Sequence, residues 1–129
     1  MLTEKDYCDY ETCVALMELG MRITSRKVYS DRDTLKHSSR GVTYTVRTAS
    51  AMGWVIAIPL YEAQKFLRER KNLNVNIRAF IKDGWYYTIQ YCDGNPLISQ
   101  LTLTDKLYKT YEEALSEGIK EAVKILKDE

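Results

Sequence analysis

The chain has 129 residues, of which 45% are hydrophobic and 29% charged, and its formal net charge is +1. These proportions are those of an ordinary globular protein, and they exclude a disordered polar chain. No apolar run is long enough to span a bilayer, so we expect no membrane partner. A chain of this length holds one hydrophobic core, which predicts a single domain over residues 1–129.

The first residues and the cysteines predict a cytoplasmic protein. Residues 1–7 are polar and acidic, whereas a secretory signal has a basic patch followed by an apolar stretch. Cys8, Cys13 and Cys92 form an odd set without a Cys-x-x-Cys pair. Such a set is typical of thiols in a reducing compartment rather than of a disulfide framework.

A helix is predicted near the N-terminus. Thr3 can cap it, and Gly20 stands at the usual position for a helix to stop. Between them the apolar residues are spaced by three and four, which places them on one helical face. These residues are Tyr7, Tyr10, Val14 and Met17.

The helical pattern disappears after Met21. The following segment is polar, with at most a short strand around Val28 and Tyr29. Residues 24–41 are therefore predicted to form a flexible loop.

Two strands and a second helix are predicted next. Residues 42–47 alternate between apolar and polar side chains, which indicates a half-buried strand, and the apolar run at 54–58 indicates a more buried one. Pro59 ends this strand. Residues 60–71 then have helical spacing, and the side chains expected to be buried are Leu60, Ala63, Phe66 and Leu67.

Residues 75–91 give the strongest structural signal, a hairpin. A two-residue turn would scatter apolar groups over both faces, whereas a three-residue turn with Gly84 in the left-handed position collects them on one face. The predicted pairs are Ile81–Trp85, Ala79–Tyr87, Ile77–Ile89 and Val75–Tyr91. The opposite face, expected to be solvated, holds Asn76, Arg78, Phe80, Lys82, Tyr86, Thr88 and Gln90.

The C-terminal part completes an α+β fold. Leu97, Leu101 and Leu103 predict a third strand and hence an antiparallel meander. Thr110 and Glu113 form a capping box that starts the last helix. The predicted order is an N-terminal helix, two or three strands, a helix, a three-stranded antiparallel meander and a C-terminal helix packed on the sheet. The last helix carries a small-residue stripe for close packing, made of Ala114, Gly118 and Ala122.

Charge is distributed unevenly along the chain. Residues 1–20 and 83–129 each have a net charge of −4, whereas residues 21–82 hold thirteen Lys and Arg against four acidic residues, a net +9. An anionic partner such as nucleic acid is the functional interpretation, and packing of acidic ends over a basic middle is the structural one. The candidate contacts are Arg22, Arg26, Lys27, Arg32, Lys36 and Arg40 in the loop, with Arg78 and Lys82 in the hairpin.

The sequence contains no recognisable catalytic, cofactor or metal-binding motif. The one histidine, His37, lies in the polar segment near Asp31 and Asp33, and sequence proximity there does not make a triad. Cys8 and Cys13 would point apart on the predicted helix, which disfavours zinc ligation together with His37 and Cys92. No glycine-rich phosphate motif occurs, so we expect no catalytic residues, no metal and no cofactor.

Two resemblances accompany these motifs. The sequences IPLYEAQKFLRE at residues 58–69 and YKTYEEAL at 108–115, with MLTEK at 1–5, resemble small proteins of unknown function, often encoded by prophages or mobile elements of anaerobic gut bacteria. That resemblance implies a bacterial cytoplasm. Residues 78–120 also look like the arm-site DNA-binding domain of tyrosine recombinases. Those domains use a basic sheet, whereas this one offers only Arg78 and Lys82 before Lys106, so shared architecture alone is implied.

The sequence thus favours a non-enzymatic accessory or interaction protein. Its expected partner is an unknown protein or a second copy of the chain, which would make a homodimer. The alternative is a nucleic-acid-binding protein that uses residues 22–40 with Arg78 and Lys82. A small enzyme built around His37 ranks third.

Overall fold

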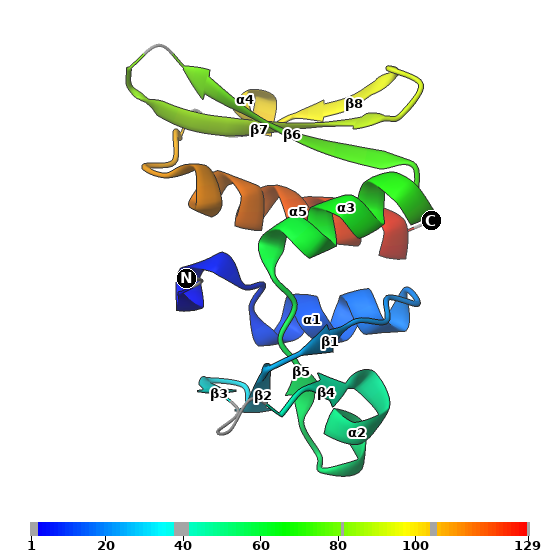
Figure 1. The fold of residues 1–129 in the computed structure, drawn as a ribbon. Coiled ribbons are helices and arrows are strands. Elements are labelled where there is room, and N and C mark those ends of the chain that lie inside the picture. The colour runs from blue at the N-terminus through cyan, green and yellow to red at the C-terminus, as the bar shows by residue number, and fades with distance from the viewer. Residues whose placement is uncertain (1–2, 38–41, 81, 104–105, 129) are drawn as a thin grey trace. The chain divides into compact units, whose positions relative to one another are not determined.

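The computed structural model describes residues 3–37, 42–80, 82–103 and 106–128 (Figure 1). Its residue contacts separate two compact units, Met1–Pro59 and Leu60–Glu129, called here the N-terminal and the C-terminal unit. The single domain predicted from chain length therefore contains an internal division. It falls at the proline that was predicted to end a strand.

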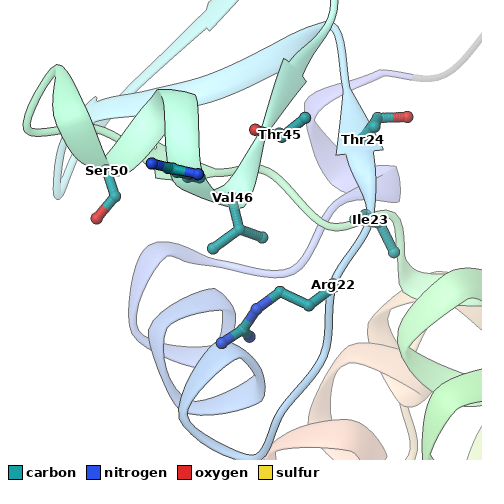
Figure 2. Close-up of a pocket in the computed structure, with 7 residues that line it drawn as sticks. Arg22, Ile23, Thr24, Thr45, Val46 and Ser50 are labelled. Atoms are coloured by element: carbon teal, nitrogen blue, oxygen red, sulfur yellow. The ribbon is translucent and has the colours of Figure 1, made fainter.

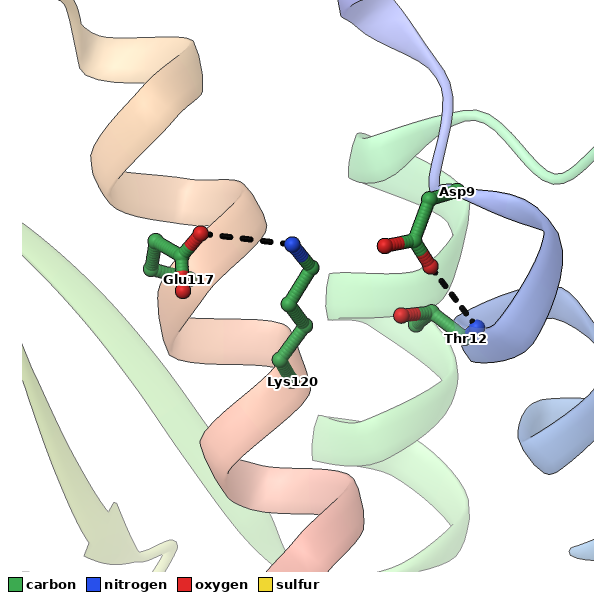
Figure 3. Close-up of polar contacts among 4 residues, drawn as sticks. All are labelled: Asp9, Thr12, Glu117 and Lys120. Carbon is green, nitrogen blue, oxygen red and sulfur yellow. Dashed lines mark hydrogen bonds and ion pairs between the residues drawn. The ribbon is translucent and has the colours of Figure 1, made fainter. Parts of the chain in front are cut away.

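The helix predicted from Thr3 to Gly20 is interrupted in the N-terminal unit. A 3-10 helix, η1 (Glu4–Asp6), is followed by extended chain, and Asp9 then caps α1 (Tyr10–Glu18) by accepting the Thr12 N–H at 2.8 Å (Figure 3). The Cys8 N–H donates to the carbonyl of Ile58 at 2.8 Å. Because this bond joins residues far apart in sequence, helical periodicity could not reveal the break. The prediction of one continuous helix was wrong.

Most of the segment predicted to be a flexible loop is strand. It contains β1 (Thr24–Ser25), β2 (Lys27–Asp31) and β3 (Thr34–His37). β2 is the central strand of a sheet with the order β3-β2-β5, and its Val28 and Tyr29 are buried. The short strand predicted around Val28 and Tyr29 is confirmed as β2, whereas the loop prediction for the rest of residues 24–37 was wrong. Residues 38–41 lie outside the described residues. Because polar residues flank Val28 and Tyr29, the sequence pattern did not indicate that this strand pairs with a second one at Thr34–His37.

Where one strand was predicted at residues 42–47, the structure has a short strand followed by a helix. β4 (Tyr44–Thr45) pairs with β1, and α2 (Val46–Ala51) follows directly. The Thr45 hydroxyl accepts the Thr48 N–H at 3.0 Å, so a local side-chain cap directs the backbone into a helix and ends the strand early. The second predicted strand shortens to β5 (Val55–Ile56), although its neighbours Ala57 and Ile58 are buried as expected.

The C-terminal unit is a three-stranded antiparallel sheet with two helices on one face (Figure 1). α3 (Leu60–Arg70) packs on β6 (Leu73–Phe80), and α5 (Tyr111–Lys127) packs on both β6 and β7 (Gly84–Tyr91). β8 (Pro96–Ser99) lies on the other side of β7. The predicted α+β class, the helix at 60–71, the meander and the C-terminal helix on the sheet are confirmed.

The hairpin has the predicted faces in a different register. The observed pairs include Val75–Ile89, Ile77–Tyr87 and Ala79–Trp85, two residues away from the predicted pairing. A shift by two keeps every side chain on its own face. Val75, Tyr87 and Ile89 of the predicted face are buried, whereas Ala79 near the hairpin loop is exposed, so the prediction of a buried face is confirmed only away from the loop. Gly84 lies in the ladder opposite Phe80, at a position where an added Cβ would come 2.8 Å from the Tyr108 carbonyl oxygen.

The third strand is shorter than predicted. It ends at Ser99, and α4 (Gln100–Leu103) takes up the leucine-rich sequence that was interpreted as strand. The chain returns to the sheet at Tyr108, which forms a bridge with Trp85. The strand prediction for Leu101 and Leu103 was therefore wrong.

The C-terminal helix begins and packs as expected. The Thr110 hydroxyl accepts the Glu113 N–H at 3.1 Å, which confirms the threonine half of the predicted capping box. The small-residue stripe faces the sheet, and a Cβ on Gly118 would lie 2.7 Å from Cγ1 of Val75. On the same helix Lys120 pairs with Glu117 at 3.2 Å, a surface contact between neighbouring turns (Figure 3).

Candidate binding surfaces

The predicted basic contacts do not belong to one unit. Arg22, Arg26, Lys27, Arg32 and Lys36 lie in the N-terminal unit, Arg78 and Lys82 lie in the C-terminal unit, and Arg40 lies outside the described residues. By sequence the N-terminal unit has eight basic and seven acidic residues, and the C-terminal unit has eleven of each. The linear block of positive charge therefore does not produce one strongly basic unit.

Several basic side chains of the N-terminal unit contact an acidic or aromatic side chain of the same unit. Such pairs at an exposed surface contribute little to stability, about 0–1 kcal/mol each. They show nonetheless that these cations have intramolecular contacts before any partner binds. Arg32 lies 3.0 Å from Glu11, Lys27 lies 5.1 Å from the ring centre of Tyr7, and Lys36 lies 4.7 Å from that of Trp54.

A pocket of about 540 Å³ opens in the N-terminal unit beside β1, β4 and the start of α2 (Figure 2). Its lining combines two guanidinium groups, three hydroxyl groups and two aliphatic side chains. Sequence reasoning identified Arg22 but missed Arg47, because Arg47 was assigned to a strand and the pocket forms only when distant segments pair. The lining residues are Arg22, Ile23, Thr24, Thr45, Val46, Arg47 and Ser50.

The face of the β6-β7-β8 sheet opposite α3 and α5 is called here the outer face. Phe80 and Tyr86 lie on it with ring centres 6.4 Å apart in an edge-to-face arrangement. Arg78 pairs directly with Tyr86 in the ladder, and the Phe80 side chain is 42% exposed. An aromatic pair beside a cation is therefore present on this face, which also holds Asn74, Asn76, Thr88 and Gln90.

β6 forms the open edge of the same sheet, since among the described residues it pairs only with β7. Trp85 exchanges both backbone hydrogen bonds with Tyr108, at 2.9 and 2.8 Å. Trp85 therefore cannot bond its ladder partner Ala79, so the backbone groups of Ala79 and, by alternation, of Ile77 point away from β7. The Val75 carbonyl follows the same rule and accepts the Gln64 side-chain amide at 2.8 Å.

The groups considered for chemistry are explained by local structure. His37 is exposed at the end of β3. Hydrogen bonds from the Thr34 side chain and then from the Asp33 backbone lower the pKa of Asp31, as expected for a tight turn. Within the described part of the chain no three His, Cys, Asp or Glu side chains cluster as metal ligands.

The cysteines are free, and two of them are core residues. Cys8 and Cys13 are both buried, and the Cys13 thiol donates to the Cys8 carbonyl at 3.6 Å. The geometric argument that a shared helix holds them apart was wrong, because Cys8 precedes α1. Cys92 is exposed.

Two buried tyrosines have raised pKa values. The Tyr29 hydroxyl donates to the Cys8 carbonyl at 2.6 Å. Burial, followed by the nearby thiols of Cys13 and Cys8, raises the pKa of Tyr29 well above its usual value. Burial likewise raises the pKa of Tyr87 to about 12. Both hydroxyl groups therefore remain neutral at physiological pH and act as parts of the core.

Comparisons with protein-family models, curated proteins and solved structures found no match to this chain. None of the helices in the described residues combines the length and apolar character required to cross a bilayer.

Proposed function

We propose that this protein is a non-enzymatic interaction protein and that the sheet of its C-terminal unit is the interaction surface. The observation that carries the proposal is the open edge of β6, where the backbone groups of Ile77 and Ala79 point away from β7. An unpaired strand edge is a template for pairing with another strand. The partner proposed first is a second copy of the same chain.

Self-pairing of β6 is geometrically consistent. Two antiparallel β6 strands centred on Ile77 would pair Ile77 with Ile77 of the second copy, and Ala79 with Val75 of the second copy, across a two-fold axis. In this register Arg78 stands opposite Asn76 of the second copy, so equal charges do not meet directly. The Val75 carbonyl already accepts the Gln64 side-chain amide at 2.8 Å, and its second lone pair can accept the Ala79 N–H of the second copy.

Replacing Ala79 with proline is expected to convert a dimer into a monomer. Proline removes an outward-pointing N–H and leaves the β6–β7 bonds intact, a position that proline tolerates in edge strands. The matched control is Ala79→Ser, which keeps the N–H. Sedimentation velocity at micromolar concentrations should show a dimer for the unaltered protein and the serine variant. A monomeric unaltered protein, or a folded proline variant that still dimerises, would contradict the proposal.

Nucleic-acid binding is the second candidate, favoured by the aromatic pair and Arg78 on the outer face. Unpaired bases stack on exposed aromatic rings, which contributes about 1–3 kcal/mol per base. We expect Phe80→Ala to weaken binding of a labelled single-stranded DNA about tenfold. Tyr61→Ala is the control, because Tyr61 is an exposed aromatic residue of α3, away from this face.

Fluorescence anisotropy over a salt series measures this binding. If the candidate is right, affinity falls steeply with salt, and Arg78→Gln lowers the slope by about one unit for the lost phosphate contact. Salt-independent binding, or equal losses for Phe80→Ala and Tyr61→Ala, would remove the candidate.

A further inference from the structure

We propose that the pocket lined by Arg22 and Arg47 in the N-terminal unit binds a small ligand through a phosphate group. The pocket lies wholly within Met1–Pro59 and is separate from the sheet proposed above as the interaction surface. Its volume of about 540 Å³ falls within the range of small-molecule sites, about 300–1,000 Å³.

The Arg22 side chain is held in a fixed position and places a positive charge on one side of this pocket. Its Nη1 donates to the carbonyl oxygens of Met17 and Met21, at 3.0 and 2.8 Å, which ties the side chain to the C-terminal end of α1. Two backbone bonds on one guanidinium nitrogen leave the remaining N–H groups of Arg22 for a ligand. Figure 2 shows the Val46 side chain directed toward Arg22, so a cation and an aliphatic group line the same space.

Arg47 supplies the second positive charge. It is the second residue of α2, it is exposed, and its side chain makes no hydrogen bond or ion pair with another described residue. A cation without an internal partner is available to pair with a ligand. Arginine is suited to this role because its planar N–H groups match two oxygen atoms of a phosphate.

The charge and chemistry of the lining favour a phosphate. None of the lining residues is acidic, so two guanidinium charges face a ligand without a competing carboxylate. A phosphate monoester carries about −1.5 to −2 charges at neutral pH, which matches them. The hydroxyl groups of Thr24 and Ser50 can add hydrogen bonds, while Ile23 and Val46 offer apolar contact to the body of the ligand.

Isothermal titration of the full chain tests this proposal with AMP, adenosine and inorganic phosphate as probes. We expect saturable binding of AMP and no binding of adenosine. Arg47→Gln should weaken AMP binding about tenfold or more, the loss of one charge-assisted contact. Arg26→Gln is the matched control, since Arg26 is exposed in the same unit but does not line the pocket.

A single-stranded oligonucleotide distinguishes the two sources of phosphate. Binding of AMP that Arg47→Gln weakens supports the proposal, whereas oligonucleotide binding with the same sensitivity and no AMP binding contradicts it, because the ligand is then a nucleic-acid phosphodiester and not a small molecule. If no phosphate-bearing probe binds, the proposal is wrong. It is also wrong if Arg26→Gln and Arg47→Gln weaken binding equally, or if adenosine binds as tightly as AMP.

Discussion

Replacement of Gly118 with valine is expected to destabilise the C-terminal unit by about 3 kcal/mol. A Cβ at this position would lie 2.7 Å from Cγ1 of Val75 and 3.1 Å from Tyr87, and both of these side chains are buried in the sheet. Helix propensity alone predicts a small gain in stability, because glycine is the poorer helix former by a few tenths of a kcal/mol. A decrease in the free energy of unfolding would therefore indicate close packing of Gly118 on the sheet, whereas a small increase would indicate that helix propensity dominates.

Urea denaturation followed by Trp85 fluorescence measures this effect in a Trp54→Phe background. Trp85 packs edge-to-face on Tyr111 of α5, with ring centres 5.5 Å apart, so its emission reports docking of the helix on the sheet. Lys124→Val is the control on the exposed side of α5, and we expect it to cost a few tenths of a kcal/mol. A Gly118→Val protein as stable as the unaltered one would show that α5 does not approach the sheet this closely.

Truncation of Leu16 to alanine is expected to cost about 2–5 kcal/mol in the N-terminal unit. Leu16 is fully buried on α1, and its removal loses apolar contacts and leaves a cavity that the surrounding structure only partly closes. Leu16 was not among the apolar residues used to predict the helix. The expected loss would therefore support the helical face seen in the structure over the predicted one.

Trp54 fluorescence in a Trp85→Phe background reports this unit, because Trp54 packs against Tyr44 with ring centres 5.7 Å apart. Glu18→Ala, at an exposed position of the same helix, should change the free energy of unfolding by less than about 0.5 kcal/mol. A similar small change for Leu16→Ala would contradict the observed orientation of α1, and a large effect of Met17→Ala with none at Leu16 would restore the predicted face.

The candidate surfaces differ in how much of them the sequence could predict. Alternation along β6 and β7 was sufficient to place Arg78, Phe80 and Tyr86 on one face, because side chains in a strand alternate whatever the register. The free edge of β6 was not predictable, since it depends on which strand pairs on each side. The Arg22–Arg47 pocket was missed because it needs β1 and β4, which are distant in sequence, to pair.

Local chemistry determined the parts of this protein that the sequence predicts on its own. The cap at Thr110, the helix after Pro59 and the two faces of the hairpin follow from side chains and backbone within a few residues. Tertiary structure alone decided the break at Cys8, which bonds to Ile58, the strand register at Gly84, which packs against Tyr108, and the strands within the polar segment. Each of these depends on hydrogen bonds or close contacts between residues distant in sequence, which neither spacing nor composition records.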